Sequence, residues 1–303
     1  MEALVMDPVI TVGLDGSPES RSAALWAAQE ARLRGCTLRM LHAWVLLSAA
    51  GEKTTAESDR DYWSKKIVDD AQREIHQLYP ELPVTEELVA EDPGPALLAA
   101  AAESELLVLG SRGMGPIAAF FLGDIGLHVV AHTDTPVVLV RAQEDTAGTA
   151  DTAARAAPPS AVGDVVVGLN LQGPCDRLLE FAFTSAARRG ATLHAVHAGK
   201  LPVQAYAPWG MDPDVVEDLS RDARKLLGDT LRPWREKFPG VEVKESVHLE
   251  SPARVINRAA AGAGLLVMGR RHKHRTALGP RIGPVLQSAL HHAPCPVAVA
   301  PHE

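Results

Sequence analysis

The chain repeats itself once, 155 to 160 residues apart, and this repeat restricts the folds that it can adopt. Residues 12–15 (VGLD) return at 167–170 (VGLN), and residues 106–110 (LLVLG) return at 265–269 (LLVMG). The offset grows only between the matched segments, where loops tolerate insertions. Because 303 residues are about twice the length of a common domain, the sequence predicts two copies of one fold in tandem.

Short apolar runs alternate with helical patterns in the first copy. We expect strands over residues 9–14, 37–45, 84–89, 106–109 and 137–140. Helical stretches separate these runs, and the longest is an amphipathic stretch over residues 59–78. This alternation predicts an α/β fold in each copy, with a five-stranded parallel sheet flanked by helices, as in Rossmann-like domains.

Residues 142–163 separate the two copies by composition. This stretch is rich in Ala, Thr, Pro and Gly and has no apolar period. It is typical of an interdomain linker. We therefore expect a first domain over residues 1–141 and a second over residues 164–303.

Composition excludes several classes of protein. The net charge of −8 gives no general attraction to nucleic acid or to an anionic membrane surface. No apolar run approaches the roughly 18 residues that span a bilayer, and the first residues do not resemble a signal peptide. Cys36, Cys175 and Cys295 lack close pairing, which predicts neither a disulfide framework nor a metal site. A cytoplasmic location is expected.

The stretch over residues 106–124 combines an apolar run, a glycine-bearing loop and an apolar helical segment. We expect Gly110 and Gly113 to adopt positive φ and to leave no Cβ between the backbone amides and a phosphate, while Arg112 supplies positive charge. The alternative is a tight strand-to-helix turn without a ligand.

Gly123 lies ten residues beyond Gly113 and completes the pattern G-x2-G-x9-G. This pattern resembles the nucleotide-binding signature of the universal stress proteins, and residues 289–297 (ALHHAPCPV) resemble the segment before their last strand. The resemblance implies the adenine-nucleotide alpha hydrolase-like form of the Rossmann-like fold, with ATP and Mg²⁺ as possible ligands. It also implies a set of contacting residues: Gly13, Asp15, Ala43, Gly110, Arg112, Gly113, Gly123 and Asp124.

Asp124 departs from the family pattern, in which a Ser or Thr hydroxyl meets a phosphate at this position. A carboxylate near the phosphates adds repulsion between like charges and weakens ATP binding. Asp15 has two readings, because a strand-end carboxylate can bind the nucleotide or can serve as a turn or helix-cap residue. His42 is enclosed among apolar residues and is expected to be a core residue.

The second copy lacks several features of this site. Asn170 replaces the strand-end Asp, His272 replaces the second glycine, and Pro284 stands where the hydroxyl is expected. The basic segment over residues 270–275 is either a solvated loop or a place where an anion is held by charge alone. We therefore expect the ligand in the first copy, with a degenerate site in the second.

Two functions remain open at this stage. The first is a non-catalytic, ATP-binding regulatory module of the stress response, acting as a homodimer on an unidentified protein partner. The second is a scaffold or dimerisation protein of the same fold that binds no nucleotide. An adenylating enzyme is disfavoured because residues 15–18 (DGSP) are not a Ser-Gly-Gly type pyrophosphate loop.

Overall fold

The computed structural model describes residues 8–45, 55–111, 124–142, 163–200, 206–207, 210–211, 213–271 and 282–302. Residues 55–61, 124, 206–207 and 210–211 are described by their backbone alone. The chain divides into two compact units, residues 1–161 and residues 162–303, and each unit is described by itself. The expected linker at residues 142–163 stays a prediction, because residues 143–162 lie outside the described part.

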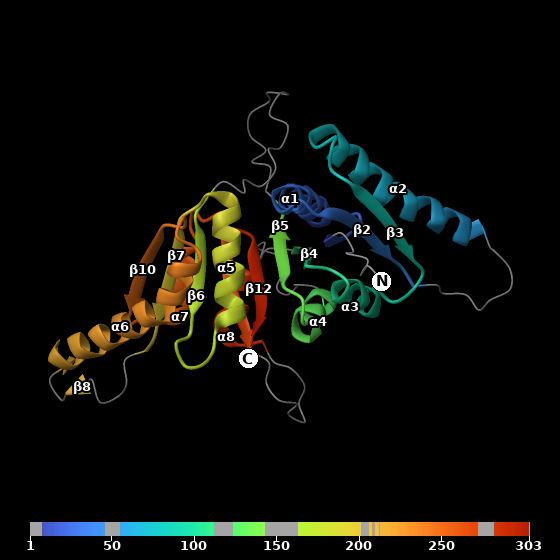
Figure 1. The fold of residues 1–303 in the computed structure, drawn as a ribbon. Coiled ribbons are helices and arrows are strands. Elements are labelled where there is room, and N and C mark those ends of the chain that lie inside the picture. Colours follow the sequence, from blue (N-terminus) through green and yellow to red (C-terminus); the bar gives the residue numbers. More distant parts are fainter. Residues whose placement is uncertain are drawn as a thin grey trace, which may run out of the picture. The chain divides into compact units, whose positions relative to one another are not determined.

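The first unit is built on a five-stranded parallel sheet (Figure 1). Its strands follow the order β3-β2-β1-β4-β5. The chain starts in the middle, moves outward to one edge, and then returns to the other side of β1. This reversal makes the neighbouring carboxyl ends of β1 and β4 a topological switch point, where ligands of such sheets bind. The strands are β1 (Val9–Gly13), β2 (Thr37–Ala43), β3 (Val84–Val89), β4 (Leu106–Ser111) and β5 (Val137–Arg141).

Four described helices cover this sheet, two on each face (Figure 1). Helices α1 and α2 lie on one face, and α3 and α4 lie on the other. Ser17 caps α1, since its hydroxyl accepts a hydrogen bond from the Ser20 amide at 3.1 Å, and Gly35 ends this helix with φ 66°. The helices are α1 (Pro18–Arg34), α2 (Thr55–Leu78), α3 (Pro93–Ala102) and α4 (Asp124–His132).

The apolar runs form strands for a simple physical reason. Val12, Leu107 and Val108 are fully buried, because helices cover both faces of the sheet at its centre. The edge strand β3 contains only half-buried and exposed residues instead. The expected strand over residues 106–109 continues to Ser111, and the expected strand over residues 37–45 ends at Ala43.

The second unit repeats this architecture with the strand order β10-β7-β6-β11-β12. The predicted fold class, two tandem Rossmann-like α/β copies, is therefore confirmed. A short hairpin of β8 (Tyr206–Ala207) and β9 (Gly210–Met211) was not predicted. The other elements are β6 (Val165–Leu169), α5 (Asp176–Arg189), β7 (Leu193–Ala198), α6 (Pro213–Lys237), β10 (Val243–His248), α7 (Pro252–Ala259), β11 (Leu265–Arg271), α8 (Pro284–His292) and β12 (Val297–His302).

None of the three cysteines forms a disulfide, and all three are buried. Burial, and to a smaller extent the neighbouring Asp176 carboxylate, raises the pKa of the Cys175 thiol above its usual value. The neutral thiol is inert, because the thiolate is the nucleophile. Among the described helices, none combines the length and the apolar character needed to cross a membrane.

We expect iodoacetamide at pH 8 to modify Cys175 at least about tenfold more slowly in the native chain than in urea. Since the folded-state pKa is raised, this protection is complete below the ordinary thiol pKa and is lost as the pH rises through the folded-state value. Peptide mapping by mass spectrometry gives the rate at each cysteine. A native Cys175 that reacts as fast as the unfolded chain would contradict the buried, neutral thiol.

Candidate functional site

A cavity of about 340 Å³ lies at the carboxyl ends of β1, β2 and β4. The amino-terminal turn of α1 and parts of α3 and α4 complete its walls. We call this cavity the crevice. Its lining residues are Gly13, Leu14, Asp15, Ser17, Glu19, Ser20, Leu41, Ala43, Pro93, Leu97, Leu109, Gly110, Ile125 and Gly126.

Four of the eight predicted site residues line the crevice together: Gly13, Asp15, Ala43 and Gly110. Arg112, Gly113 and Gly123 lie outside the described residues. The backbone of Asp124 begins α4, and its side chain is not described. The crevice therefore joins two predicted residues that are 97 positions apart in sequence, Gly13 and Gly110, at the ends of the adjacent strands β1 and β4.

Gly110 is a glycine for a different reason from the one that we expected. It belongs to β4, and it is not among the described glycines with positive φ. A Cβ at this position would lie 2.6 Å from the backbone of both Glu19 and Ser20, at the start of α1. The prediction of positive φ at Gly110 was wrong, and close packing of the first turn of α1 against β4 explains the residue.

Asp15 forms a local turn at the mouth of the crevice. Its Oδ1 accepts hydrogen bonds from the Ser17 amide at 2.9 Å and from the Ser17 hydroxyl at 2.5 Å. Ser17, not Asp15, caps α1. Of the two structural roles considered for Asp15, the turn residue is therefore confirmed and the helix cap was wrong. Since Asp15 is exposed, its carboxylate also borders the cavity where a ligand can reach it.

His42 is a core residue, as predicted. It is buried, its Nδ1 lies 2.7 Å from the Leu14 carbonyl oxygen, and its ring stacks on Trp44. The second unit repeats the contact, with His197 Nδ1 3.0 Å from the Leu169 oxygen. Because the same contact occurs in both copies, we assign the two histidines a structural role. Each holds the end of the first strand of its unit, β1 or β6, against the second strand, β2 or β7.

Carboxylates and apolar side chains dominate the described crevice wall. Asp15 and Glu19 supply two carboxylates, and the described residues that line the crevice include no Lys, Arg or His. Such a wall suits a ligand part with hydrogen-bond donors and an apolar face, because carboxylates accept hydrogen bonds and repel anions. Glu19, Leu97 and Ile125 were not predicted, since only the packing of three helices onto the strand ends brings them there.

Side chains of β11 and β12 reach the corresponding region of the second unit. Arg271 donates a hydrogen bond to the Gln172 carbonyl oxygen at 2.5 Å, and His302 Nδ1 lies 3.1 Å from the Pro174 oxygen. These contacts tie the loop after β6 to β11 and β12. In addition, the His302 ring fills the space where Gly269 would carry a Cβ.

Arg270 corrects one prediction for the second unit. The basic segment over residues 270–275 was expected to be a solvated or anion-holding loop, but Arg270 lies in β11 and is only 6% exposed. It stands at the position of Ser111, which is also buried, and its longer side chain adds bulk at the end of the strand. His272 to Arg275 lie outside the described residues.

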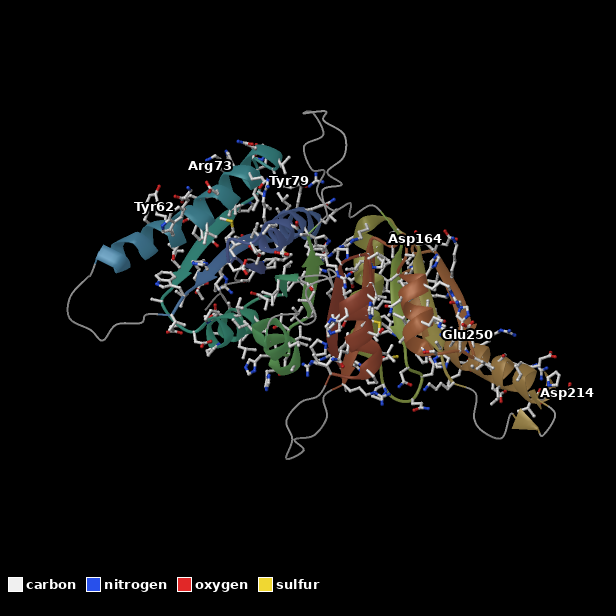
Figure 2. All side chains as sticks on the ribbon, turned by 180° about the vertical axis from the view of Figure 1, so that it is seen from behind. Tyr62, Arg73, Tyr79, Asp164, Asp214 and Glu250 are labelled. Atoms are coloured by element: carbon white, nitrogen blue, oxygen red, sulfur yellow. The ribbon has the colours of Figure 1, made fainter. Side chains whose placement is uncertain are left out.

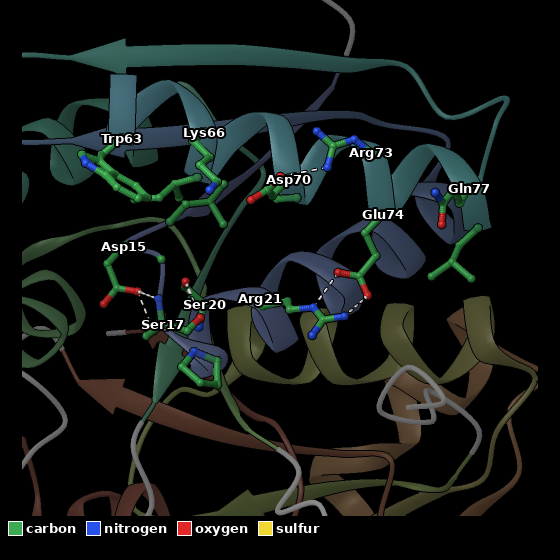
Figure 3. A pocket seen from close by; sticks show the side chains of 16 residues that line it. Asp15, Ser17, Ser20, Arg21, Trp63, Lys66, Asp70, Arg73, Glu74 and Gln77 are labelled. Atoms are coloured by element: carbon green, nitrogen blue, oxygen red, sulfur yellow. Dashed lines mark hydrogen bonds and ion pairs between the residues drawn. The ribbon is translucent and has the colours of Figure 1, made fainter. Parts of the chain in front are cut away.

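A larger groove of about 930 Å³ lies between α1 and α2 (Figure 3). Figure 3 shows Arg21 of α1 reaching Glu74 of α2, at 2.6 and 2.7 Å, and Arg73 beside Asp70. Tyr62 and Trp63 of α2 are exposed, and Figure 2 shows Tyr62 and Arg73 along this helix. Because four of its charged residues already form ion pairs, and because it meets the sheet only at the loop after β1 whereas the crevice meets three strands, we favour the smaller crevice as the site.

The fold and the crevice define a class of protein: a tandem pair of doubly wound α/β domains, of which the first opens a cavity at its switch point. The model of the universal stress protein family matches residues 8–141 and residues 162–301. The chain belongs to this family, as its sequence pattern indicated.

Relatives and solved structures agree with this assignment. A universal stress protein of Mycobacterium tuberculosis is 31% identical over 298 residues, which cover 96% of each chain. One from Mycolicibacterium smegmatis is 29% identical over 301 residues and also covers 96% of each chain. The crystal structure of a universal stress protein from Archaeoglobus fulgidus is 18% identical, has a TM-score of 0.68, and covers 97% of this chain and 98% of its own. That likeness shows the fold.

Proposed function

We propose that this protein is a non-catalytic regulatory module that binds an adenine nucleotide in its first unit and acts in the stress response. The same proposal includes a cytoplasmic location, assembly as a homodimer, and a protein partner that binds differently to the nucleotide-bound and nucleotide-free forms. One observation carries it: Gly13, Asp15, Ala43 and Gly110, which the family resemblance implies as contact residues, line a single open cavity at the switch point of the first sheet.

The crevice is suited to bind the nucleoside part of the ligand. Asp15 and Glu19 can accept hydrogen bonds from ribose hydroxyls or from the adenine amine, and Leu41, Leu97 and Leu109 offer apolar contact to the base. We assign the phosphates to the loop between Gly110 and Asp124, where Arg112, Gly113 and Gly123 match the family signature. That assignment rests on the resemblance, since residues 112–123 lie outside the described part.

A single ligand in the first unit is favoured by the contrast between the copies. The turn at Asp15 is held by its own neighbours Ser17 and Ser20, so the space between this loop and β4 stays open. In the second unit, Arg271 and His302 hold the corresponding loop. We therefore place the ligand in the first unit alone.

Native mass spectrometry of the protein purified without added nucleotide tests the proposal against its alternative. A co-purifying adenine nucleotide at one per chain is the expected result. A chain that carries none, and that gains no thermal stability in millimolar AMP or ATP, would instead favour a scaffold of the same fold that binds no nucleotide. The hydrogen bonds from Ser17 to the Asp15 carboxylate favour this scaffold function, because they already occupy one oxygen that would otherwise bind the nucleotide.

Asp124→Ser is expected to strengthen ATP binding at neutral pH, and more strongly without magnesium. A carboxylate about 4 Å from a phosphate costs roughly 4 kcal/mol at an effective dielectric near 20, before relaxation. Magnesium reduces this cost because one cation can bridge the carboxylate and the phosphates. Calorimetric titration of the wild type and the variant, with Mg²⁺ and with EDTA, measures both effects.

AMP serves as the control ligand, since its single phosphate is nearer the ribose and should respond less to Asp124→Ser. Equal ATP affinity of the two proteins under both conditions would mean that the carboxylate does not face the phosphates. The assignment of the phosphates to the loop before Asp124 would then be wrong, while the proposed binding of the nucleoside in the crevice would be unaffected.

A further inference from the structure

Two exposed histidines lie together on α4. His128 and His132 are four residues apart, both are exposed, and their ring centroids are 4.1 Å apart with an angle of 32° between the planes. Residues at this spacing lie one above the other on a helix. Two imidazoles therefore face each other at the surface, where water and ions reach them.

A backbone hydrogen bond fixes the tautomer of one of them. His132 Nδ1 lies 2.7 Å from the His128 carbonyl oxygen, and a carbonyl only accepts, so Nδ1 carries the hydrogen. The lone pair of the neutral ring is then on Nε2. Histidines that bind metals are commonly held in this way, with one ring nitrogen donating to a carbonyl and the other binding the ion.

The spacing of the rings is close to that of a chelate. Two imidazoles that share one Zn²⁺ at about 2.1 Å have ring centres roughly 5 Å apart in a tetrahedral site. Small rotations of two exposed side chains bring 4.1 Å to that value. No backbone movement is needed.

The position on the helix also favours a cation. His132 lies in the last turn of α4, where the carbonyl end of the helix carries partial negative charge. The chain as a whole has a net charge of −8. A divalent ion at this end of α4 is therefore attracted both locally and by the overall charge.

We propose that His128 and His132 form a two-ligand site for a divalent transition metal of the Zn²⁺ class, with water at the remaining positions. Neutral imidazole nitrogen suits Zn²⁺ and its neighbours, whereas Mg²⁺ prefers oxygen. Within the described residues no group of three or more His, Cys, Asp and Glu side chains is suited to a metal, so this is an open site with two protein ligands. Bound metal links adjacent turns of the nine-residue α4 and stabilises its carboxyl-terminal half.

The repeat supplies a matched control. His292 ends α8 as His132 ends α4, but Ser288 stands at the position of His128. The ring beside His292 is that of His291, its neighbour in sequence, at 6.5 Å and 67°. The second unit thus has the same terminal histidine without the partner one turn earlier.

The test is a calorimetric Zn²⁺ titration of the untagged 303-residue chain at pH 7.5, and of its variants His128→Gln, His132→Gln and His292→Gln. Glutamine keeps the helix, because its helix propensity exceeds that of histidine. We expect each α4 variant to lose at least about tenfold in Zn²⁺ affinity and His292→Gln to match the wild type. Mg²⁺ should not bind at this site in any of the four proteins.

Hydrogen exchange gives a second readout. Saturating Zn²⁺ should slow amide exchange in the last turn of α4 in the wild type and in His292→Gln, and should leave it unchanged in His128→Gln and His132→Gln. Unchanged Zn²⁺ affinity in either α4 variant would overturn the proposal, because the chain's ten other histidines would then account for the binding. An equal loss in His292→Gln would overturn it as well.

Discussion

Gly110→Ala is expected to destabilise the first unit by about 3 kcal/mol, at the upper end of the usual cost of overpacking. The added methyl would lie 2.6 Å from the backbone of both Glu19 and Ser20, where no flexible side chain can move aside. Either α1 shifts away from β4 or the strand bends. Urea unfolding, followed by tryptophan fluorescence, measures the loss, since Trp26, Trp44 and Trp63 belong to the first unit and Trp209 and Trp234 to the second.

Gly240→Ala is the control, because a Cβ there meets no atom within 4 Å and Gly240 is not among the positive-φ glycines. It should leave stability within about 1 kcal/mol of the wild type. The pair also separates two reasons for a glycine at position 110. If Gly110→Ala lost nucleotide affinity at full stability, a phosphate rather than α1 would be the close neighbour, and the packing explanation would fail.

The repeat and the strand patterns could be predicted because they depend on neighbours in sequence. Val12, Leu107 and Val108 lie in continuous apolar runs, and such runs suit strands covered on both faces. The parallel sheet flanked by helices followed from the alternation of strands with helices, whereas the order of the strands was not predicted. His42 was predicted as a core residue for the same local reason.

Features set by distant packing were predicted less well. The reason for Gly110 depends on where α1 begins, because the first turn of this helix is what approaches β4. In the second unit α5 begins at Asp176, which corresponds to Arg21, so its first turn starts three residues later than that of α1. Local pattern contains no information on such contacts, and the burial of Arg270 at the end of β11 was missed for the same reason.

The candidate site was predicted in part. Gly13, Asp15, Ala43 and Gly110 were assigned from a resemblance and are brought together by the fold. Glu19 and Ile125 line the same cavity without a sequence signal, because neither residue type is distinctive in the first turn of a helix. The rest of the predicted set, from Arg112 to Asp124, stays a prediction.

Ala43→Phe is expected to weaken adenine-nucleotide binding by on the order of 100-fold, or about 2.7 kcal/mol. Ala43 is the last residue of β2 and lines the crevice. A phenyl ring at this half-buried position fills part of a cavity of about 340 Å³, and the base then has no room beside Leu41. The strand itself should tolerate the change, because aromatic residues favour strands.

Ala198 provides the matched substitution in the second unit, since it ends β7 as Ala43 ends β2. Calorimetric titration of the wild type, Ala43→Phe and Ala198→Phe with AMP tests most directly whether the crevice of the first unit is the nucleotide site. The account predicts one site per chain in the wild type and in Ala198→Phe, and its loss in Ala43→Phe. Two equivalent sites in the wild type, or full binding by a folded Ala43→Phe, would contradict it.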